Sequence, residues 1–124
     1  MSLKSPLSRV LGMGSAKEGT EHWWAQRVTA IALAPLSLWF VFSMIFASGF
    51  DYDTIAGWLG RPLNAVLMIL LAATLLYHSR LGVQVVVEDY VHGSMKLVAL
   101  LLSQFVHIAL GVAAIFAVLK ISLG

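Results

Sequence analysis

The chain has 124 residues, of which 60% are hydrophobic and only 11% charged, with a formal net charge of +2. Disordered chains are far more polar, and eight basic plus six acidic residues are too few to cover a water-soluble domain. The composition therefore indicates a membrane protein; the lack of cysteine excludes disulfides and iron–sulfur clusters, and the small charge gives no sign of nucleic-acid binding.

Residues 1–21 form a mixed, basic segment ahead of the first apolar stretch. Leu3, Leu7 and Leu11 have helical spacing that would suit a short surface helix, although Pro6 weakens this interpretation. We expect a frayed cytoplasmic tail over 1–21, followed by one membrane domain over 22–124.

Three apolar segments follow. The first and third contain runs of 23 residues without a formal charge, at 28–50 and 97–119, and the second is interrupted only by Arg80. About 20 residues are needed for a helix to cross the ~30 Å hydrocarbon core of a bilayer. The sequence predicts an all-α integral membrane protein that forms part of a multi-subunit helical bundle. Its three transmembrane helices would span about 27–50, 62–88 and 96–119.

Helix-breaking and helix-capping residues separate these three segments. Pro62 suits the first turn of the second helix, because its missing N–H costs little there. Gly93 separates the second and third helices, with Ser94 as a candidate N-cap. Pro35 predicts a kink in the first helix. Aromatic residues near the expected helix ends fit an interfacial belt: Trp23, Trp24, Tyr52, Trp58 and Tyr90.

The distribution of basic residues predicts the orientation. The side shared by the N-terminus and the second connection holds Lys4, Arg9, Lys17, Arg27, Arg80 and Lys96. Only Arg61 and Lys120 fall on the other side. The positive-inside rule therefore puts the N-terminus in the cytoplasm, or in the mitochondrial matrix.

The second helix carries most of the polar residues expected at membrane depth. At 100° per residue, His78, Gly82 and Asp89 share one face, and His78 lies about 16 Å from Asp89 along the axis. A glycine one turn from a histidine leaves flat space that a porphyrin could occupy. Lone transmembrane histidines more often form hydrogen bonds between helices, so spacing alone leaves haem ligation as one alternative.

His107 lies at a similar depth in the third helix, so spacing permits a haem held by His78 and His107 together. However, the small residues Ala109, Ala113 and Ala117 predict the packing face of that helix. His107 lies about 120° from Ala113 and off this face, which disfavours it as a ligand.

The entry to the first helix is the other candidate site. Arg27, followed by Thr29, could pair with an anion such as a haem propionate or a lipid phosphate through its planar guanidinium. The alternative is ordinary anchoring of the helix end by a basic residue and an aromatic belt.

Two segments together resemble a known family. His22-Trp-Trp-Ala-Gln-Arg-Val-Thr-Ala-Ile-Ala-Leu and His78-x₃-Gly82-x₆-Asp89-Tyr90 are similar to the hydrophobic membrane anchor subunit of succinate dehydrogenase (complex II). The resemblance covers about residues 20–95, and the three-helix layout fits the whole chain.

The resemblance implies roles for four residues. His78 would be one axial ligand of the iron of haem b, with the other ligand from a companion cytochrome b subunit, and Arg27 would lie near a haem propionate. Tyr90 would hydrogen-bond a ubiquinone carbonyl beside the iron–sulfur subunit, with Asp89 orienting it or relaying protons. His22 is a less secure match, because its offset from the arginine varies in the family, and Arg80 and His92 have no firm family counterpart.

The resemblance also implies a function. The chain would anchor the flavoprotein and iron–sulfur subunits, would not be catalytic alone, and would help pass electrons from succinate to ubiquinone in a bacterial inner membrane, with a mitochondrial one less expected. One alternative is the anchor of a fumarate reductase. Another is a small non-redox transporter, which would need a carboxylate at membrane depth that the first and third helices lack.

Overall fold

The computed structural model describes residues 16–124, and every regular element among them is a helix. Residues 1–15, including the segment considered above as a surface helix, lie outside this described part. Three helices are long and apolar enough to cross a membrane, which confirms the predicted all-α membrane fold with three spans. In chain order the helices are α2 (Ala16–Ile45), α3 (Tyr52–Leu59), α4 (Pro62–Tyr90) and α5 (Ser94–Leu123).

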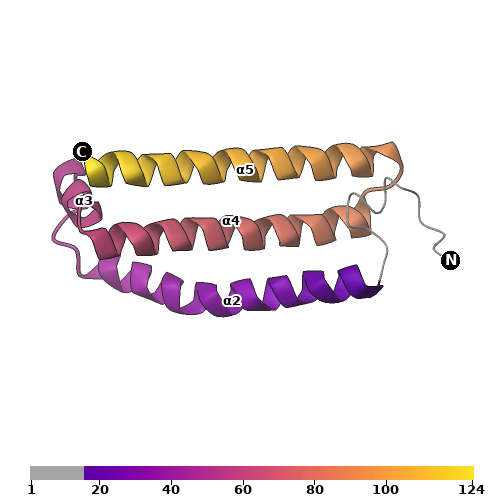
Figure 1. The fold of residues 1–124 in the computed structure, drawn as a ribbon, viewed down its shortest axis with the longest axis horizontal. Coiled ribbons are helices and arrows are strands. Elements are labelled where there is room, and N and C mark those ends of the chain that lie inside the picture. Colours follow the sequence, from indigo (N-terminus) through magenta and orange to yellow (C-terminus); the bar gives the residue numbers. More distant parts are fainter. Residues whose placement is uncertain (1–15) are drawn as a thin grey trace.

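The first membrane helix, α2, begins and ends earlier than the expected span of 27–50. Its first turns extend into a polar stretch containing Glu21 and Gln26, which are good helix formers whether or not lipid surrounds them. It ends at Ile45, shortly before the weak helix former Gly49. α2 continues unbroken through Pro35 and is visibly curved (Figure 1).

The three long helices lie side by side in a single layer, with α4 in the middle (Figure 1). α4 packs against α2 on one side and α5 on the other, whereas in the described residues no Cα atoms of α2 and α5 lie within 8 Å of each other. Neighbouring helices run antiparallel (Figure 1). As a result, α4 has two separate helix interfaces, and polar residues at similar depth on it can have different partners.

The short helix α3 closes one end of the layer, beside the C-terminal end of α5 (Figure 1). Its N-cap is Asp51, whose carboxylate accepts hydrogen bonds from the hydroxyl of Thr54 at 2.7 Å and from its backbone N–H at 3.3 Å. Leu59 of α3 packs with Ala65 of α4 and Val118 of α5 in a small buried cluster. This cluster stabilises the α3 end of the layer, which is the end opposite to Asp89 and Tyr90.

The face of α5 that packs against α4 differs from the predicted one. Ala109, Ala113 and Ala117 are exposed, so their assignment as the packing stripe is wrong. The true packing face contains Gly111, where an added Cβ would lie 3.7 Å from Leu76 of α4. Small residues occur on both faces of α5, so their spacing alone cannot show which face meets a neighbouring helix.

The connection between α4 and α5 is a turn over residues 91–93. Gly93 has φ 70° and ψ −151°, a backbone region that essentially only glycine adopts, and this allows the chain to reverse within so few residues. Gly93 itself is the N-cap of α5 and Ser94 is already helical, so the predicted Ser94 cap is wrong. At the other end, α4 begins at Pro62 as predicted.

The layer buries little of its own surface. Among the described residues only six apolar side chains are buried, whereas Phe46 and Ile31 are 81% and 70% exposed. Such surface is unfavourable in water but favourable in the hydrocarbon of a bilayer. The open sides of the layer are therefore suited to lipid or to other membrane helices.

Candidate functional site

His78 lies at the interface between α4 and α2. Its Nδ1 atom is 2.8 Å from the hydroxyl oxygen of Thr29 on α2, and Thr29 is only 9% exposed. The same hydroxyl lies 2.7 Å from the carbonyl oxygen of Ala25 and 3.0 Å from that of Gln26. The imidazole is therefore held by one ring nitrogen, at a point fixed by the register of two antiparallel helices.

The other ring nitrogen of His78, Nε2, has no hydrogen-bond partner among the described residues, and the chain does not enclose it. One turn further along α4, Gly82 has open space around it, because an added Cβ would meet no atom within 4 Å. A half-buried imidazole with one free nitrogen, next to an open glycine surface, is a donor arrangement that fits a planar metal cofactor approaching from outside the chain.

His22 shares the α4-facing side of α2 with Thr29, since the two residues are seven positions, or about two turns, apart. Its Nε2 atom is enclosed and has no hydrogen-bond partner in the described residues. A buried nitrogen without a partner is costly, so this position needs a further polar group that the described chain does not supply.

Arg27 does not reach the contact between Thr29 and His78. It lies two residues before Thr29, about 160° around α2, and its side chain is exposed. The guanidinium carbon lies 5.2 Å from the ring centroid of Trp23, a cation–π contact, and Trp23 meets Trp24 edge to face at 5.6 Å. Arg27 is thus presented on the outer surface of α2, at nearly the depth of His78.

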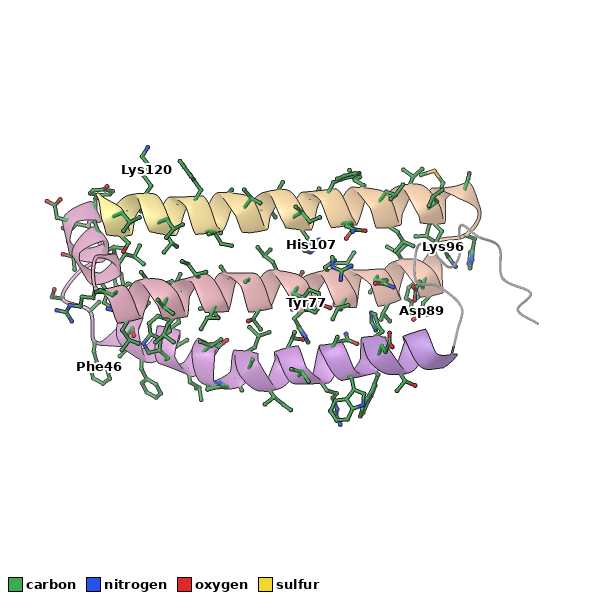
Figure 2. All side chains as sticks on the ribbon, viewed as in Figure 1. Phe46, Tyr77, Asp89, Lys96, His107 and Lys120 are labelled. Atoms are coloured by element: carbon green, nitrogen blue, oxygen red, sulfur yellow. The ribbon has the colours of Figure 1, made fainter. Side chains whose placement is uncertain are left out.

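Asp89 and Tyr90 are the last two residues of α4, next to the turn into α5. Figure 2 shows Asp89 at this end of the layer. Both are exposed, Tyr90 at 78%, and neither makes a hydrogen bond or ion pair with other described residues. Glu88 differs, because its carboxylate accepts a hydrogen bond from the side-chain amide of Gln84 at 3.0 Å. The structure therefore separates two adjacent carboxylates: Glu88 has a partner within the chain, and Asp89 is free to meet another molecule.

His107 points from α5 toward α4 (Figure 2), so the prediction that it lies off the packing face is wrong. Its Nδ1 donates to the carbonyl oxygen of Ser103 at 2.8 Å, and its Nε2 lies 3.1 Å from the hydroxyl of Ser79, which must then be the donor. Both ring nitrogens of His107 have hydrogen-bond partners, whereas Nε2 of His78 has none among the described residues. The structure therefore places the two histidines at similar depth but in different interfaces of α4.

Two hollows in the chain lie away from the predicted site residues. One, of about 280 Å³, lies between α4 and α5 and is lined by Tyr77, Arg80 and His107 among others, with Arg80 over the Tyr77 ring at 5.1 Å. The other, of about 570 Å³, lies at the α3 end and is lined partly by Trp58 and Arg61. Neither contains His78, Arg27, Asp89 or Tyr90.

The sequence singled out Thr29 only as a companion of Arg27 toward an external anion. In the structure its hydroxyl is buried and hydrogen-bonds to His78 and to two backbone carbonyls. The expected spans gave no signal for this contact, because they put Thr29 at the start of the first helix and His78 well inside the second. The two depths agree only because α2 begins as early as Ala16.

The chain matches the family model described as succinate dehydrogenase/fumarate reductase transmembrane subunit over residues 1–119. It is 39% identical over 88 residues to a succinate dehydrogenase hydrophobic membrane anchor subunit of Rickettsia bellii, covering 71% of this chain and 70% of that protein. A protein of the same name from Paracoccus denitrificans is 31% identical over 120 residues, covering 97% and 93% of the two chains. No solved structure matches the chain.

Proposed function

This chain belongs to the succinate dehydrogenase/fumarate reductase transmembrane subunit family, and we propose that it is the membrane anchor subunit of a succinate dehydrogenase. The family description names both enzymes, but the relatives from Rickettsia bellii and Paracoccus denitrificans are both named for succinate dehydrogenase, which favours succinate oxidation as the direction. The fold supports an anchoring role, because three membrane helices form almost the whole of the described chain.

The proposed partners are the flavoprotein and iron–sulfur subunits and a companion cytochrome b subunit. The chain has no cysteine for a cluster, so it would not be catalytic alone. The wide exposed apolar sides of the layer offer room for the helices of a companion subunit. We place the complex in a bacterial inner membrane with this chain's N-terminus in the cytoplasm, as the positive-inside rule indicates.

His78 is proposed as the residue of this chain that would bind the iron of a haem b shared with the cytochrome b subunit. When bound, the haem would supply a one-electron redox centre within the membrane. The free Nε2 of His78 and the open surface at Gly82 fit this role, whereas both nitrogens of His107 already have partners. Arg27, exposed on the outer surface of α2, would pair with a haem propionate through its guanidinium.

Tyr90 and Asp89 are proposed to form part of the site that reduces ubiquinone. The phenol hydroxyl of Tyr90 would donate a hydrogen bond to a quinone carbonyl, and this bond strengthens as negative charge develops on that oxygen. Asp89 would orient the phenol or pass protons to it from the cytoplasm. Both side chains lack partners in the described chain and lie at one end of the layer, as contact with a soluble subunit requires.

The observation that carries this proposal is the family match over residues 1–119 together with the singly bonded imidazole of His78. The test is a complex purified from membranes through a tag on this chain. We expect flavoprotein, iron–sulfur and cytochrome b subunits to co-purify, and a reduced-minus-oxidised spectrum with a b-type band. His78→Ala should lose most of that band while the chain still inserts, because one histidine contributes little to hydropathy.

The matched control is His107→Ala, which removes an imidazole at similar depth from the other interface of α4. We expect that variant to keep its haem. A normal b-type spectrum in His78→Ala, or its loss only in His107→Ala, would contradict the ligand assignment.

A further inference from the structure

The contact between Thr29 and His78 determines which ring nitrogen carries the proton. A hydroxyl has one proton to donate and two lone pairs to accept with. The Thr29 oxygen lies 2.7 Å from the carbonyl oxygen of Ala25, and two oxygens that close repel unless a proton lies between them. The hydroxyl proton therefore points to the backbone, and the oxygen presents a lone pair to His78.

The same oxygen lies 3.0 Å from the carbonyl oxygen of Gln26, which likewise can only accept, and its one other neighbour among the described residues is Nδ1 of His78, at 2.8 Å. Because the oxygen can only accept on this side, Nδ1 must carry the ring proton and donate it. In a neutral imidazole the other nitrogen then has no proton. Nε2, the nitrogen that the chain leaves free, is thus the one with an available lone pair.

We propose that Thr29 is the positioning residue for the haem ligand: it accepts the Nδ1 proton of His78, selects the tautomer with a free Nε2 lone pair and fixes the plane of the ring. This inference rests on the proposed haem ligation by His78. Partners of the non-ligating nitrogen commonly orient a histidine ligand and raise its basicity. Here the partner comes from a neighbouring helix, so ligand geometry depends on how α2 packs against α4.

A stronger electron donor stabilises ferric over ferrous iron. The hydrogen bond to Thr29 raises the donor strength of His78, so losing that bond should raise the midpoint potential of the haem. It should also weaken haem binding, since replacing such an outer partner typically costs about 10- to 100-fold in affinity.

The test uses Thr29→Val in the intact membrane complex, because valine keeps the branched shape and removes the acceptor. We expect a higher haem midpoint potential, a shifted low-spin ferric EPR signal and at least about 10-fold faster haem loss to an apo-protein acceptor. Thr29→Ser keeps the hydroxyl and should match the wild type in all three measurements. Thr29→Cys has a similar size but a weak sulfur acceptor, so its three values should lie between those of the valine and serine variants. If the valine variant does not assemble, the cysteine variant takes its place in the test.

The matched control is Thr74→Val, which removes a hydroxyl four residues before His78 on its own helix, where it is not the partner of the imidazole. We expect no change in that variant. Wild-type potential and EPR signal in Thr29→Val, or equal shifts in the serine and valine variants, would overturn the role of Thr29. A wild-type complex without haem, or haem that survives His78→Ala, would instead overturn the proposed function itself.

Discussion

Polar side chains of α4 divide into those with partners inside the chain and those without. His78 pairs with Thr29, Ser79 with His107, and Glu88 with Gln84. Asp89 and Tyr90 have no such partner among the described residues. An unpaired polar group at a membrane protein's surface is normally met by water, a headgroup or another molecule. Besides the free Nε2 of His78, Asp89 and Tyr90 therefore offer α4's polar groups to an external ligand.

For Tyr90 we expect a selective defect. Tyr90→Phe removes the hydroxyl but no internal hydrogen bond, so the complex should assemble and oxidise succinate with an artificial soluble acceptor at the normal rate. Its ubiquinone reduction should fall by about 10-fold or more, the loss expected for one hydrogen-bond donor to a developing negative charge.

The control for this prediction is Tyr52→Phe, which removes an equally exposed phenol, 73% against 78%, at the opposite end of the layer. That variant should keep both activities. Equal loss of both activities in Tyr90→Phe would show that the hydroxyl serves assembly rather than quinone reduction.

At the residue scale the sequence located His78 and its depth, because depth follows from position along an apolar segment. It could not show that Thr29 is the partner of His78, since that pairing depends on the register between two helices. The error over Ala109, Ala113 and Ala117 has the same origin. In lipid both faces of a helix are apolar, so periodicity does not separate a packed face from a lipid-facing one.

At the scale of elements, α3 is the helix that the sequence did not predict. It has only eight residues, too few to show as an apolar span, and it is held by tertiary contacts. Its Trp58 stacks on Trp39 of α2 with ring centroids 5.4 Å apart, and its Leu59 packs with α4 and α5. Short helices gain little stability from their own backbone, so local sequence carries little information about them.

The start of α3 should depend on pH through its cap. Hydrogen bonds from the Thr54 hydroxyl, and secondly from its backbone N–H, hold the pKa of Asp51 below its usual range. Because the folded-state pKa is lowered, the contribution of the cap is complete above the ordinary carboxyl range and is lost as pH falls through the lowered value. We expect the α3 amides to exchange faster with solvent at low pH, measured by hydrogen–deuterium exchange corrected for intrinsic rates.

Variants of Asp51 and Asp53 distinguish capping of α3 by the Asp51 side chain from the effect of a nearby negative charge. Asp51→Ala should show fast α3 exchange at every pH, whereas Asp51→Asn keeps a capping side chain and should lose the pH dependence. Asp53→Asn removes a nearby exposed carboxylate that does not cap the helix and should behave as wild type. A pH effect that persisted in Asp51→Asn would assign it to another group.

At the scale of the whole molecule, the two ends of the helix layer face opposite compartments. The proposed orientation puts the end with Asp89 and Tyr90 on the cytoplasmic side and the α3 end on the other side. Because the chain has no cysteine of its own, a single introduced cysteine can be labelled to measure which compartment each end faces. Asp53→Cys lies at the α3 end and His92→Cys in the turn between α4 and α5, and both positions are exposed. An impermeant maleimide should label Asp53→Cys in spheroplasts and His92→Cys in inverted vesicles. The reverse pattern would contradict a cytoplasmic N-terminus.

The central place of α4 has a consequence for biogenesis. It is the least hydropathic of the three membrane helices and carries Arg80, so by itself it partitions into lipid less readily than its neighbours. Its imidazole and Ser79 find their partners on α2 and α5, one synthesised before it and one after. The polar contacts of α4 are therefore complete only after α5 has been inserted as well.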